Sequence, residues 1–531
     1  MAAASDMQKM RLLVERGADV NARSAAGNTA IALASRLPSG GEAVRLLLRK
    51  GGAATVAVLR NALRQGDLLL ARELISAGVK PDGAVATISA AAASGSAEAL
   101  RLALTGVEEL PKPAAASASP LMLAAFGGPA ESVRLLLARK AGLNDRDSRG
   151  RTALMHAVAG PHPEPAIIRA LIEAGADVSI KDTRGDTAAE WARLRGDARA
   201  LQAMGVSSTA APIPAAETQA ALPPLRQSLQ RGLALLDAAG PAFFKANGCI
   251  SCHNQSIPQV AYARIRQAGV PVEQAGADRH TKAVLATWAS ELPNMWQTSC
   301  QVGGGQVATM TYGLVGLAAV GQPRTAAIDG AVHCLMALQQ TDGAWDLPDR
   351  RAPLGIGREK FTALAIRGLQ AYALPGRRQE LDQRIGRART YLEKAVHEDT
   401  QALVFRILGL RWAGGDADLI DRLTRELSQL QRADGGWAQR PEFVADAYAT
   451  GQALWALVEG GGRTAADAGY RRGAEYLRRT QQSDGSWYVR SRGFGFQPYR
   501  ETGFPHGHDQ WLSAAGTGFA LIGLAPMAAL R

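Results

Sequence analysis

Apolar residues recur every three or four positions along most of this 531-residue chain, which is the spacing of one face of a helix. The spacing is clear in segments such as "FTALAIRGLQAYA", "ALVFRILGLRWAG" and "ATGQALWALVEGG". Runs of β-branched residues are few, and aromatic residues make up only 5% of the chain. The pattern therefore predicts an all-α protein. A chain of this length exceeds one ordinary core, so we expect two or three domains.

A short repeat occupies residues 1–205. The pattern Gly-x-Thr-Ala opens an apolar helix at Gly27, Gly150 and Gly185. More degenerate copies between them have the order helix, short glycine turn, helix. The repeat resembles the ankyrin unit, in which a glycine closes one helix and a threonine caps the next. The resemblance implies about five or six units, the first of them truncated, stacked into a solenoid that binds a protein partner or only supports its neighbour.

A linker and a second repeat follow. Residues 206–224 are rich in Ala, Pro and Ser without periodicity, which predicts a linker. A helical segment is expected over 225–284. From 285 to 531 the pattern Gln, three residues, Gly, one residue, Trp occurs three times, as QQTDGAW, QRADGGW and QQSDGSW, ending at Trp345, Trp437 and Trp487.

This second repeat resembles the QW motif of squalene and oxidosqualene cyclases. The resemblance implies an α/α toroid of the terpenoid cyclase and protein prenyltransferase type over 285–531. In that family the Gln and Trp side chains tie the end of one helix to the next, with Asp-Gly making the turn between them. We therefore expect these residues to stabilise the fold and not to catalyse.

The segment between the repeats contains Cys249-Ile250-Ser251-Cys252-His253, the C-x-x-C-H pattern of c-type haem attachment. The thiols of Cys249 and Cys252 would add to the two haem vinyl groups, and His253 would bind the iron. A redox dithiol, a partial metal site and two buried thiols are the alternatives. We expect haem c as the cofactor, with electron transfer or redox sensing as its role.

A sixth ligand to the haem iron would come from further along the chain. Met295, which follows Leu-Pro-Asn, is the first candidate. Met310, at the start of an expected toroid helix, and His280 are others, and five-coordinate haem is a further possibility.

Features of the sequence point to different cellular compartments. Cys300 and Cys334 would form a disulfide in an exported protein or stay as buried thiols. Because haem c is attached outside the cytoplasm, we expect a periplasmic or other extracytoplasmic location. The first residues lack a secretory pattern and alone predict the cytoplasm. However, residues 7–17 resemble the second helix of a truncated repeat, so we expect the true start, with a signal peptide, further upstream.

The toroid resemblance also implies a rival function, a terpenoid-cyclase-like enzyme acting on a hydrophobic small molecule. Squalene-hopene cyclases protonate an alkene with an Asp-x-Asp-Asp motif. The comparable stretch here has one acid, Asp446, beside Tyr448, and no Asp-x-Cys segment of the prenyltransferase zinc site occurs. His506 and His508 lie in a polar, aromatic-rich stretch; they would bind a metal, transfer protons or belong to a loop that closes the ring.

The net charge of +12 comes mostly from single arginines between acidic residues, which is typical of solvated helix faces. We therefore expect no nucleic-acid partner. No uninterrupted apolar run of 18 residues occurs, which predicts no transmembrane helix. The chain as a whole resembles bacterial multidomain proteins that combine ankyrin repeats, a cytochrome-like C-x-x-C-H and squalene-cyclase-like repeats. A cytosolic scaffold with inert cysteines is the remaining alternative.

Overall fold

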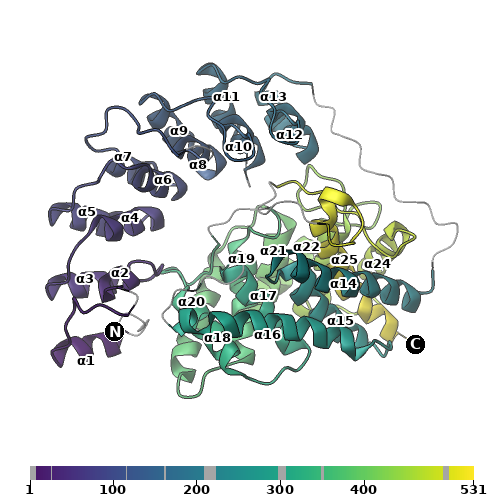
Figure 1. The fold of residues 1–531 in the computed structure, drawn as a ribbon. Coiled ribbons are helices and arrows are strands. Elements are labelled where there is room, and N and C mark those ends of the chain that lie inside the picture. Colours follow the sequence, from purple (N-terminus) through teal and green to yellow (C-terminus); the bar gives the residue numbers. More distant parts are fainter. Residues whose placement is uncertain are drawn as a thin grey trace. The chain divides into compact units, whose positions relative to one another are not determined.

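The computed structural model describes residues 7–25, 27–114, 117–160, 163–207, 223–296, 300, 306–347, 352–493 and 501–530. These residues form helices and turns, with two isolated β-bridges and no β-strand among them, so the all-α prediction is confirmed (Figure 1). The chain divides into two compact units, one up to residue 212 with 492–494 and one comprising the remainder. Most of the predicted linker, 206–224, lies outside the described residues.

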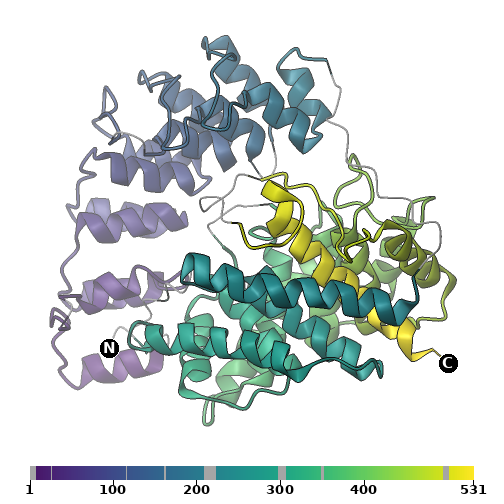
Figure 2. The same cartoon turned by 45° about the vertical axis from the view of Figure 1, so that its right-hand side comes forward.

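The first unit is a stack of helix pairs that follow α1 (Met7–Glu15). The first helix of each pair packs against the first helix of the next pair, and Figure 2 shows this stack from a second side. The pairs are α2 (Ala30–Ala34) and α3 (Gly41–Arg49), α4 (Val56–Gln65) and α5 (Leu68–Ser76), α6 (Val85–Ala93) and α7 (Ala97–Ala103), α8 (Pro120–Gly127) and α9 (Ala130–Leu137), α10 (Ala153–Ala159) and α11 (Pro165–Glu173), and α12 (Ala188–Arg195) and α13 (Ala198–Ala203).

The threonine of each Gly-x-Thr-Ala pattern caps the start of a helix, as the sequence predicts. The side-chain oxygens of Thr29, Thr152 and Thr187 each accept the backbone N–H of the residue three positions on, at 3.3 to 3.4 Å. Each threonine thereby satisfies one of the amides that a helix start leaves without an intrahelical partner. The glycines two positions before them have positive φ angles, which side chains with a Cβ adopt only with strain.

An aspartate before two of these caps joins each turn to the helix behind it. His156 Nε2 lies 3.1 Å from Asp147 Oδ2, and Trp191 Nε1 donates to Asp182 Oδ2 at 3.0 Å. Asp147 also accepts two backbone N–H groups of its own turn. Because the same carboxylate bonds the turn and the helix, it fixes the angle between them.

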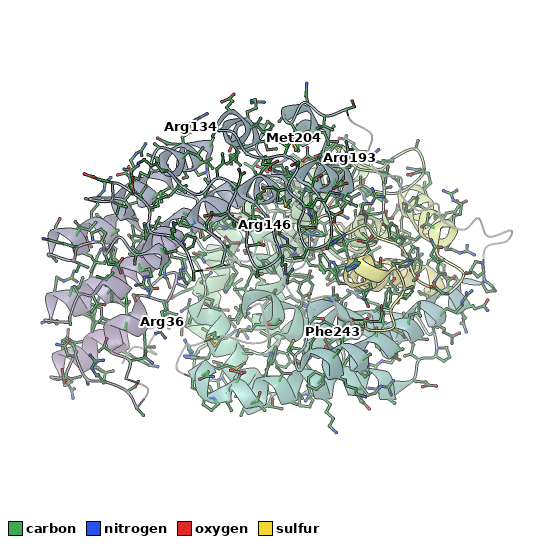
Figure 3. All side chains as sticks on the ribbon, turned by 45° about the horizontal axis from the view of Figure 1, so that its top comes forward. Arg36, Arg134, Arg146, Arg193, Met204 and Phe243 are labelled. Carbon is green, nitrogen blue, oxygen red and sulfur yellow. A yellow bond between two sulfur atoms is a disulfide. The ribbon has the colours of Figure 1, made fainter. Side chains whose placement is uncertain are left out.

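Arginine–glutamate pairs connect the second helices of successive pairs in the first unit. Most of these side chains are at least one-third exposed, so each pair contributes only about 0–1 kcal/mol. Figure 3 shows the many charged side chains of this unit, with Arg134 of α9 labelled. The arrangement agrees with the solvated helix faces expected from the sequence. The pairs are Arg11–Glu42, Arg45–Glu73, Arg72–Glu98 and Arg101–Glu131.

The second unit also consists of helix pairs, and we call the second member of each pair a ring helix. The ring helices pack in order from the first to the last, and the last packs back on the first, so the described ring is closed. The pairs, ring helix second, are α14 (Leu225–Asn247) and α15 (Ile257–Gln267), α16 (Gln274–Trp296) and α17 (Gln306–Ala319), α18 (Ala326–Ala337) and α19 (Arg358–Ala371), α20 (Arg378–Lys394) and α21 (Thr400–Trp412), α22 (Ala417–Gln429) and α23 (Ala447–Trp455), and α24 (Ala468–Thr480) and α25 (Gln510–Leu524).

The pattern of buried residues explains why the second helix of each pair is a ring helix and the first is a covering helix, which packs on the outside of the ring helices. Ring helix α21 is buried on every side from residue 400 to 410, whereas α22 buries only one stripe of four residues. A helix that is apolar all round must be enclosed, and an amphipathic one covers it. The helices over 225–284, which the sequence set apart as a separate segment, belong to this unit, and α15 is one of its ring helices.

Each QW repeat forms the turn that leads into a ring helix. The amides of Gln339, Gln431 and Gln481 each donate to the carbonyl of the glycine four residues on, at 2.8 to 2.9 Å. Each amide donates a second time, to a carbonyl of the covering helix of another pair. For Gln481 this second acceptor is Ser228 of α14, at 3.0 Å and 253 residues away. The last repeat is thereby bonded to the first helix of the unit.

The tryptophans of the three repeats are equivalent as well. Each is at most 1% exposed, and its indole N–H donates to the carbonyl ten residues earlier, at 2.6 to 2.7 Å. Each ring thus buries a large apolar area while its one polar atom is satisfied. The predicted stabilising role of these residues agrees with their contacts.

One ring helix meets the length and composition of a membrane span. The window lies within Gly507–Ala529, and 78% of it is buried inside the unit. The core helix of a folded unit passes the same test, so this is weak evidence for a membrane segment.

We expect Gln481→Met to lower the free energy of unfolding of the second unit. Methionine fills a similar volume but leaves two buried carbonyls without their donor, at about 1–3 kcal/mol for each. Gln482→Met is the matched control, since the neighbouring Gln482 is only partly buried. Chemical unfolding of both variants measures the difference; equal stabilities would contradict the role assigned to Gln481.

The first unit should lose stability in acid through Asp147. Burial opposes ionisation, but hydrogen bonds from His156 and two backbone amides lower the pKa of Asp147 from 3.8 to about 2. Because the folded pKa lies below the unfolded one, this stabilisation is present above about pH 4 and is lost as the pH falls towards 2. Burial also lowers the pKa of His156, which adds to the loss of stability below about pH 6.5.

Native-state hydrogen exchange of residues 147–160, corrected for intrinsic rates, measures this effect at pH 6 and pH 3. We expect the protection to fall with pH in the wild type and to change less in Asp147→Asn, which starts lower. Asp145→Asn, at an exposed neighbouring acid, is the control and should follow the wild type. A wild-type slope in Asp147→Asn would contradict the assignment.

Candidate functional site

The C-x-x-C-H segment forms the turn between α14 and α15, the place that QW turns take in three later pairs. A π-helical turn, Cys252–Ser256, runs directly into α15. Cys252 is 6% exposed and His253 is 4% exposed, whereas Cys249 is partly exposed. The motif therefore extends from the surface of the second unit into its interior.

Hydrogen bonds of Ser251, Asn254 and Gln255 hold this turn together. The Ser251 N–H donates to Gln255 Oε1 at 2.8 Å, and Gln255 Nε2 donates to the Gly240 carbonyl of α14 at 2.9 Å. The Asn254 N–H donates to Ser251 Oγ at 3.2 Å. Gln255 thus bonds this turn to α14, much as the QW glutamines bond their turns to covering helices.

Aromatic rings surround the imidazole of His253. Phe243, which Figure 3 labels, lies edge-on with ring centroids 5.8 Å apart, and Trp511 lies edge-on at 6.2 Å. His253 Nδ1 is 3.9 Å from the Cys252 sulfur. The imidazole is therefore shielded from bulk water by apolar rings on α14 and α25.

His280, considered above as a haem ligand, contacts a carboxylate of α14. Its Nε2 lies 3.2 Å from Asp237 Oδ1, and the Tyr262 hydroxyl donates to the other oxygen of the same carboxylate. A Cβ added at Gly240 would come within 2.4 Å of His280 Cε1 and 2.8 Å of the Asn254 carbonyl oxygen. His280 therefore packs against the back of the C-x-x-C-H turn, where only glycine fits on α14.

Two buried tyrosines lie beside Cys252. Tyr448 of α23 donates to Gln401 Oε1 of α21 at 2.6 Å, and Tyr312 comes from α17. Burial, with the nearby Cys252 thiol adding to it, raises the pKa of both hydroxyls well above 10. Both tyrosines therefore remain protonated. Ring helices α17 and α23 are not neighbours in the ring, so these side chains meet across its middle.

The sequence singled out Tyr448 but missed Tyr312, Gln401 and Lys360. Lys360 is fully buried and donates to the carbonyls of Pro353 and Leu354 at 2.9 and 2.8 Å. Gln401 and Lys360 lie in the first turn of their ring helices, α21 and α19. A polar residue in the first turn of an apolar helix was the signal that could have found these two.

Asp446 has the place of a helix cap. Its Oδ1 accepts the Ala449 N–H at 2.9 Å, and its Oδ2 accepts from the Gln439 amide at 2.6 Å. Both oxygens are thus committed to the start of α23, as expected for a capping aspartate.

His506 contacts the last QW turn. His506 Nε2 is 2.8 Å from Ser486 Oγ in the last QW turn, and its ring lies edge-on to Tyr488. Burial lowers the pKa of His506, so it is neutral at physiological pH. His508 is exposed. Among the described residues no three His, Cys, Asp or Glu side chains are placed to hold a metal ion.

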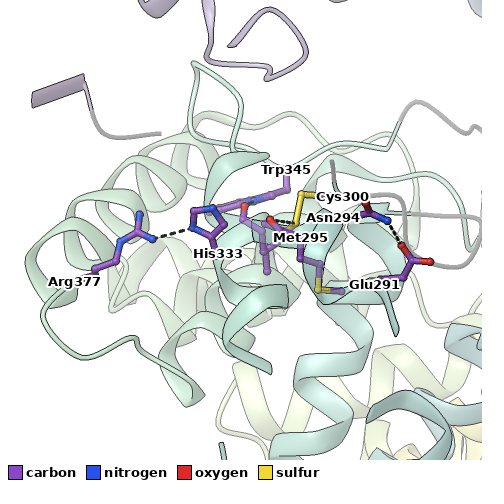
Figure 4. Close-up of a disulfide and its surroundings, with 9 residues drawn as sticks. Glu291, Asn294, Met295, Cys300, His333, Trp345 and Arg377 are labelled. Carbon is purple, nitrogen blue, oxygen red and sulfur yellow. Dashed lines mark hydrogen bonds between the residues drawn. A yellow bond between two sulfur atoms is a disulfide. The ribbon is translucent and has the colours of Figure 1, made fainter. Parts of the chain in front are cut away.

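Met295 belongs to a separate cluster, which Figure 4 shows. It is fully buried near the end of α16, and its side chain packs against Gly330 of α18. A disulfide joins Cys300 to Cys334 of α18, with Cα atoms 5.9 Å apart. The neighbours of Met295 are thus those of the disulfide, whereas His253 has Phe243 and Trp511 around it.

Comparisons with known proteins bear on the first unit. Residues 88–182 match the family model of ankyrin repeats in three copies. The first unit contains ankyrin repeats. We therefore call it the ankyrin array; outside the matched residues, Thr29 and Thr187 cap helices as Thr152 does within them.

A curated relative and a solved structure are similar to the array. Ankyrin repeat and SAM domain-containing protein 6 of Rattus norvegicus is 41% identical over 81 residues, which is 15% of this chain. The match spans only 9% of the length of that relative. The crystal structure of the human ASB11 ankyrin repeat domain aligns with a TM-score of 0.32 and 21% identity, covering 40% of this chain and 97% of that one.

Gly240→Ala should disturb the C-x-x-C-H turn. The added methyl group would press on the His280 ring and the Asn254 carbonyl, and overpacking of this kind costs about 1–3 kcal/mol. Gly386→Ala is the matched control, because Gly386 lies in α20 with open space around it and should gain about 0.5–1 kcal/mol. Thermal unfolding of both variants is the measurement, and a stabilised Gly240→Ala would show that the turn is not packed as described.

Proposed function

We propose that this chain is an extracytoplasmic binding protein that carries covalent haem c for electron transfer or redox sensing. The haem would be held by Cys249, Cys252 and His253 in the second unit, which we interpret as an α/α toroid of the QW-repeat type. The ankyrin repeats support binding to a protein partner. Bound haem would supply one-electron chemistry.

The observation that carries the proposal is the place of the motif. Three later turns into ring helices use Gln and Trp for stability. In the first turn Gln255 and Ser251 make hydrogen bonds that stabilise the turn, and Cys249, Cys252 and His253 stand there in the C-x-x-C-H spacing. Covalent haem gives a reason for this spacing, because two thiols and the following imidazole are the groups that c-type attachment uses.

The surroundings of the motif suit a haem. Cys249 is partly exposed and Cys252 is buried, so the thiols lie at the boundary between solvent and the unit interior. A porphyrin has polar propionates and an apolar ring, and a boundary of this kind accommodates both. Phe243 and Trp511 would keep water from His253 on the protein side.

The Cys300–Cys334 disulfide supports the extracytoplasmic part of the proposal. Structural disulfides persist in oxidising compartments and are rare in the cytosol. Haem c is also attached outside the cytoplasm, so both features favour the same location. The two thiol pairs are separate in sequence and in structure, and each supports export independently.

A pyridine-haemochrome spectrum of the denatured protein tests the haem. The chain is expressed with an export signal and the c-type maturation machinery, and we expect a covalent c-type signal at about one haem per chain. Cys249→Ala with Cys252→Ala should abolish the signal. Cys300→Ala with Cys334→Ala removes the same number of sulfur atoms and should keep it. A wild-type protein without covalent haem would reject the proposal and leave a scaffold without this cofactor.

A further inference from the structure

Basic residues gather in two successive turns of the ankyrin array, 145–151 before α10 and 181–186 before α12. We call these segments the basic turns. Arg146, which Figure 3 labels, joins them, because its guanidinium donates to the Gly150 carbonyl at 3.2 Å and to the Lys181 carbonyl at 2.7 Å. The cations of both segments therefore belong to one surface. They are Arg146, Arg149, Arg151, Lys181 and Arg184.

Two acidic side chains of the basic turns point inward. Asp182 is 6% exposed, and the side chain of Asp147 is 11% exposed. Each bonds its turn to the helix behind it and accepts two N–H groups of its own turn. The other acids are Asp145 and Asp186, and Asp186 pairs with Arg184 at 3.2 Å. The outer surface therefore carries more positive than negative charge.

The cations of the basic turns are close enough to repel one another. Burial, followed by the nearby charge of Arg149, lowers the pKa of Arg151 from 12.5 to about 10, whereas two carboxylates act in the opposite direction. The guanidinium carbons of Arg151 and Arg184 lie 5.9 and 5.2 Å from the ring centroid of Trp191. The ring holds these groups in place, so binding an anion there orders few side chains.

Charges elsewhere in the array are arranged differently. On the second helices, arginines pair with glutamates of the next repeat, as Arg45 does with Glu73. Helices α6 and α8 contain no charged residue. The positive surface of the basic turns thus does not continue along the array as the long stripe that a nucleic-acid backbone requires.

The spacing of the repeats limits the shape of the partner. Helices α10 and α12 pack on each other, and packed helices lie about 8–10 Å apart. An extended peptide advances about 3.3 Å per residue, so three residues cover this distance. Acidic side chains three positions apart would reach both basic turns, where arginines bind carboxylates through charge-assisted hydrogen bonds.

We propose that the basic turns bind an extended acidic segment of a protein partner, with carboxylates three positions apart. The proposal rests on the protein-binding role proposed for the ankyrin array and is independent of haem. Arg146, Arg149, Lys181 and Arg184 provide the positive surface.

Two matched peptides test the proposal on the full-length protein. One is a Gly-Ser peptide that contains Glu-Glu-Gly-Glu-Glu, and the other has glutamine in place of each glutamate. Fluorescence anisotropy of the labelled peptides at low ionic strength measures binding. We expect the glutamate peptide to bind at least about tenfold more tightly than the glutamine peptide, and its affinity to fall as salt is added.

Lys181→Gln with Arg184→Gln is the informative variant, because it removes two exposed cations and keeps side chains of similar length. It should weaken binding of the glutamate peptide by at least about tenfold. Lys50→Gln with Arg134→Gln removes two exposed cations elsewhere on the array and should stay within about twofold of the wild type. Thermal unfolding checks that both variants fold, and Lys181→Gln alone serves if the first pair does not.

The proposal is overturned by equal binding of the two peptides, by unchanged binding in the folded Lys181 and Arg184 variant, or by an equal loss in the control. Tighter binding of a single-stranded oligonucleotide than of the glutamate peptide would also overturn it. Haem content is recorded for the same samples, so a protein without haem that binds the peptide, or one with haem that does not, shows which of the two proposals has failed.

Discussion

The second unit depends on one side chain used in the same way three times, the glutamine amide at the turn into a ring helix. A helix that ends inside a protein leaves carbonyl groups without partners, and these are costly when buried. Each glutamine satisfies one carbonyl of its own turn and one of another covering helix. The bond from Gln481 to Ser228 extends this scheme to the first helix of the unit. Closure therefore requires α14, and the ring cannot be shortened at that end without exposing an apolar edge.

The ankyrin array is held together by contacts between neighbouring repeats and not by closure of a ring. Its helices pack on their neighbours in sequence, and its caps, aspartate bonds and arginine pairs all join residues within one or two repeats. Local cohesion of this kind allows one repeat to loosen while others stay folded. The ring has no such freedom, because its first and last helices hold each other. One chain thus combines a unit whose repeats pack only on their neighbours with a unit whose first and last helix pairs pack on each other.

Regular patterns were predictable from the sequence and isolated residues were not. The threonine caps and the Gln and Trp contacts were predictable because their motifs recur along the chain. Each copy supports the same structural interpretation as the others. The inclusion of α14 and α15 in the ring was not predictable, because their turn lacks Gln and Trp at the usual spacing. Tyr312 was also missed, since one polar residue in the middle of an apolar helix has no periodic signal. Asp446 matched a catalytic position in sequence, yet its hydrogen bonds are those of a helix cap.

Helix α14 connects the closure of the ring to the C-x-x-C-H turn. Its Ser228 accepts the amide of Gln481, and its Gly240 accepts the amide of Gln255 in that turn. Both residues belong to α14, so a displacement of this helix would act on both contacts. The turn that carries Cys252 and His253 is therefore positioned by the same helix that closes the ring. Any group attached to that turn would respond to the integrity of the whole ring, which no local loop could provide.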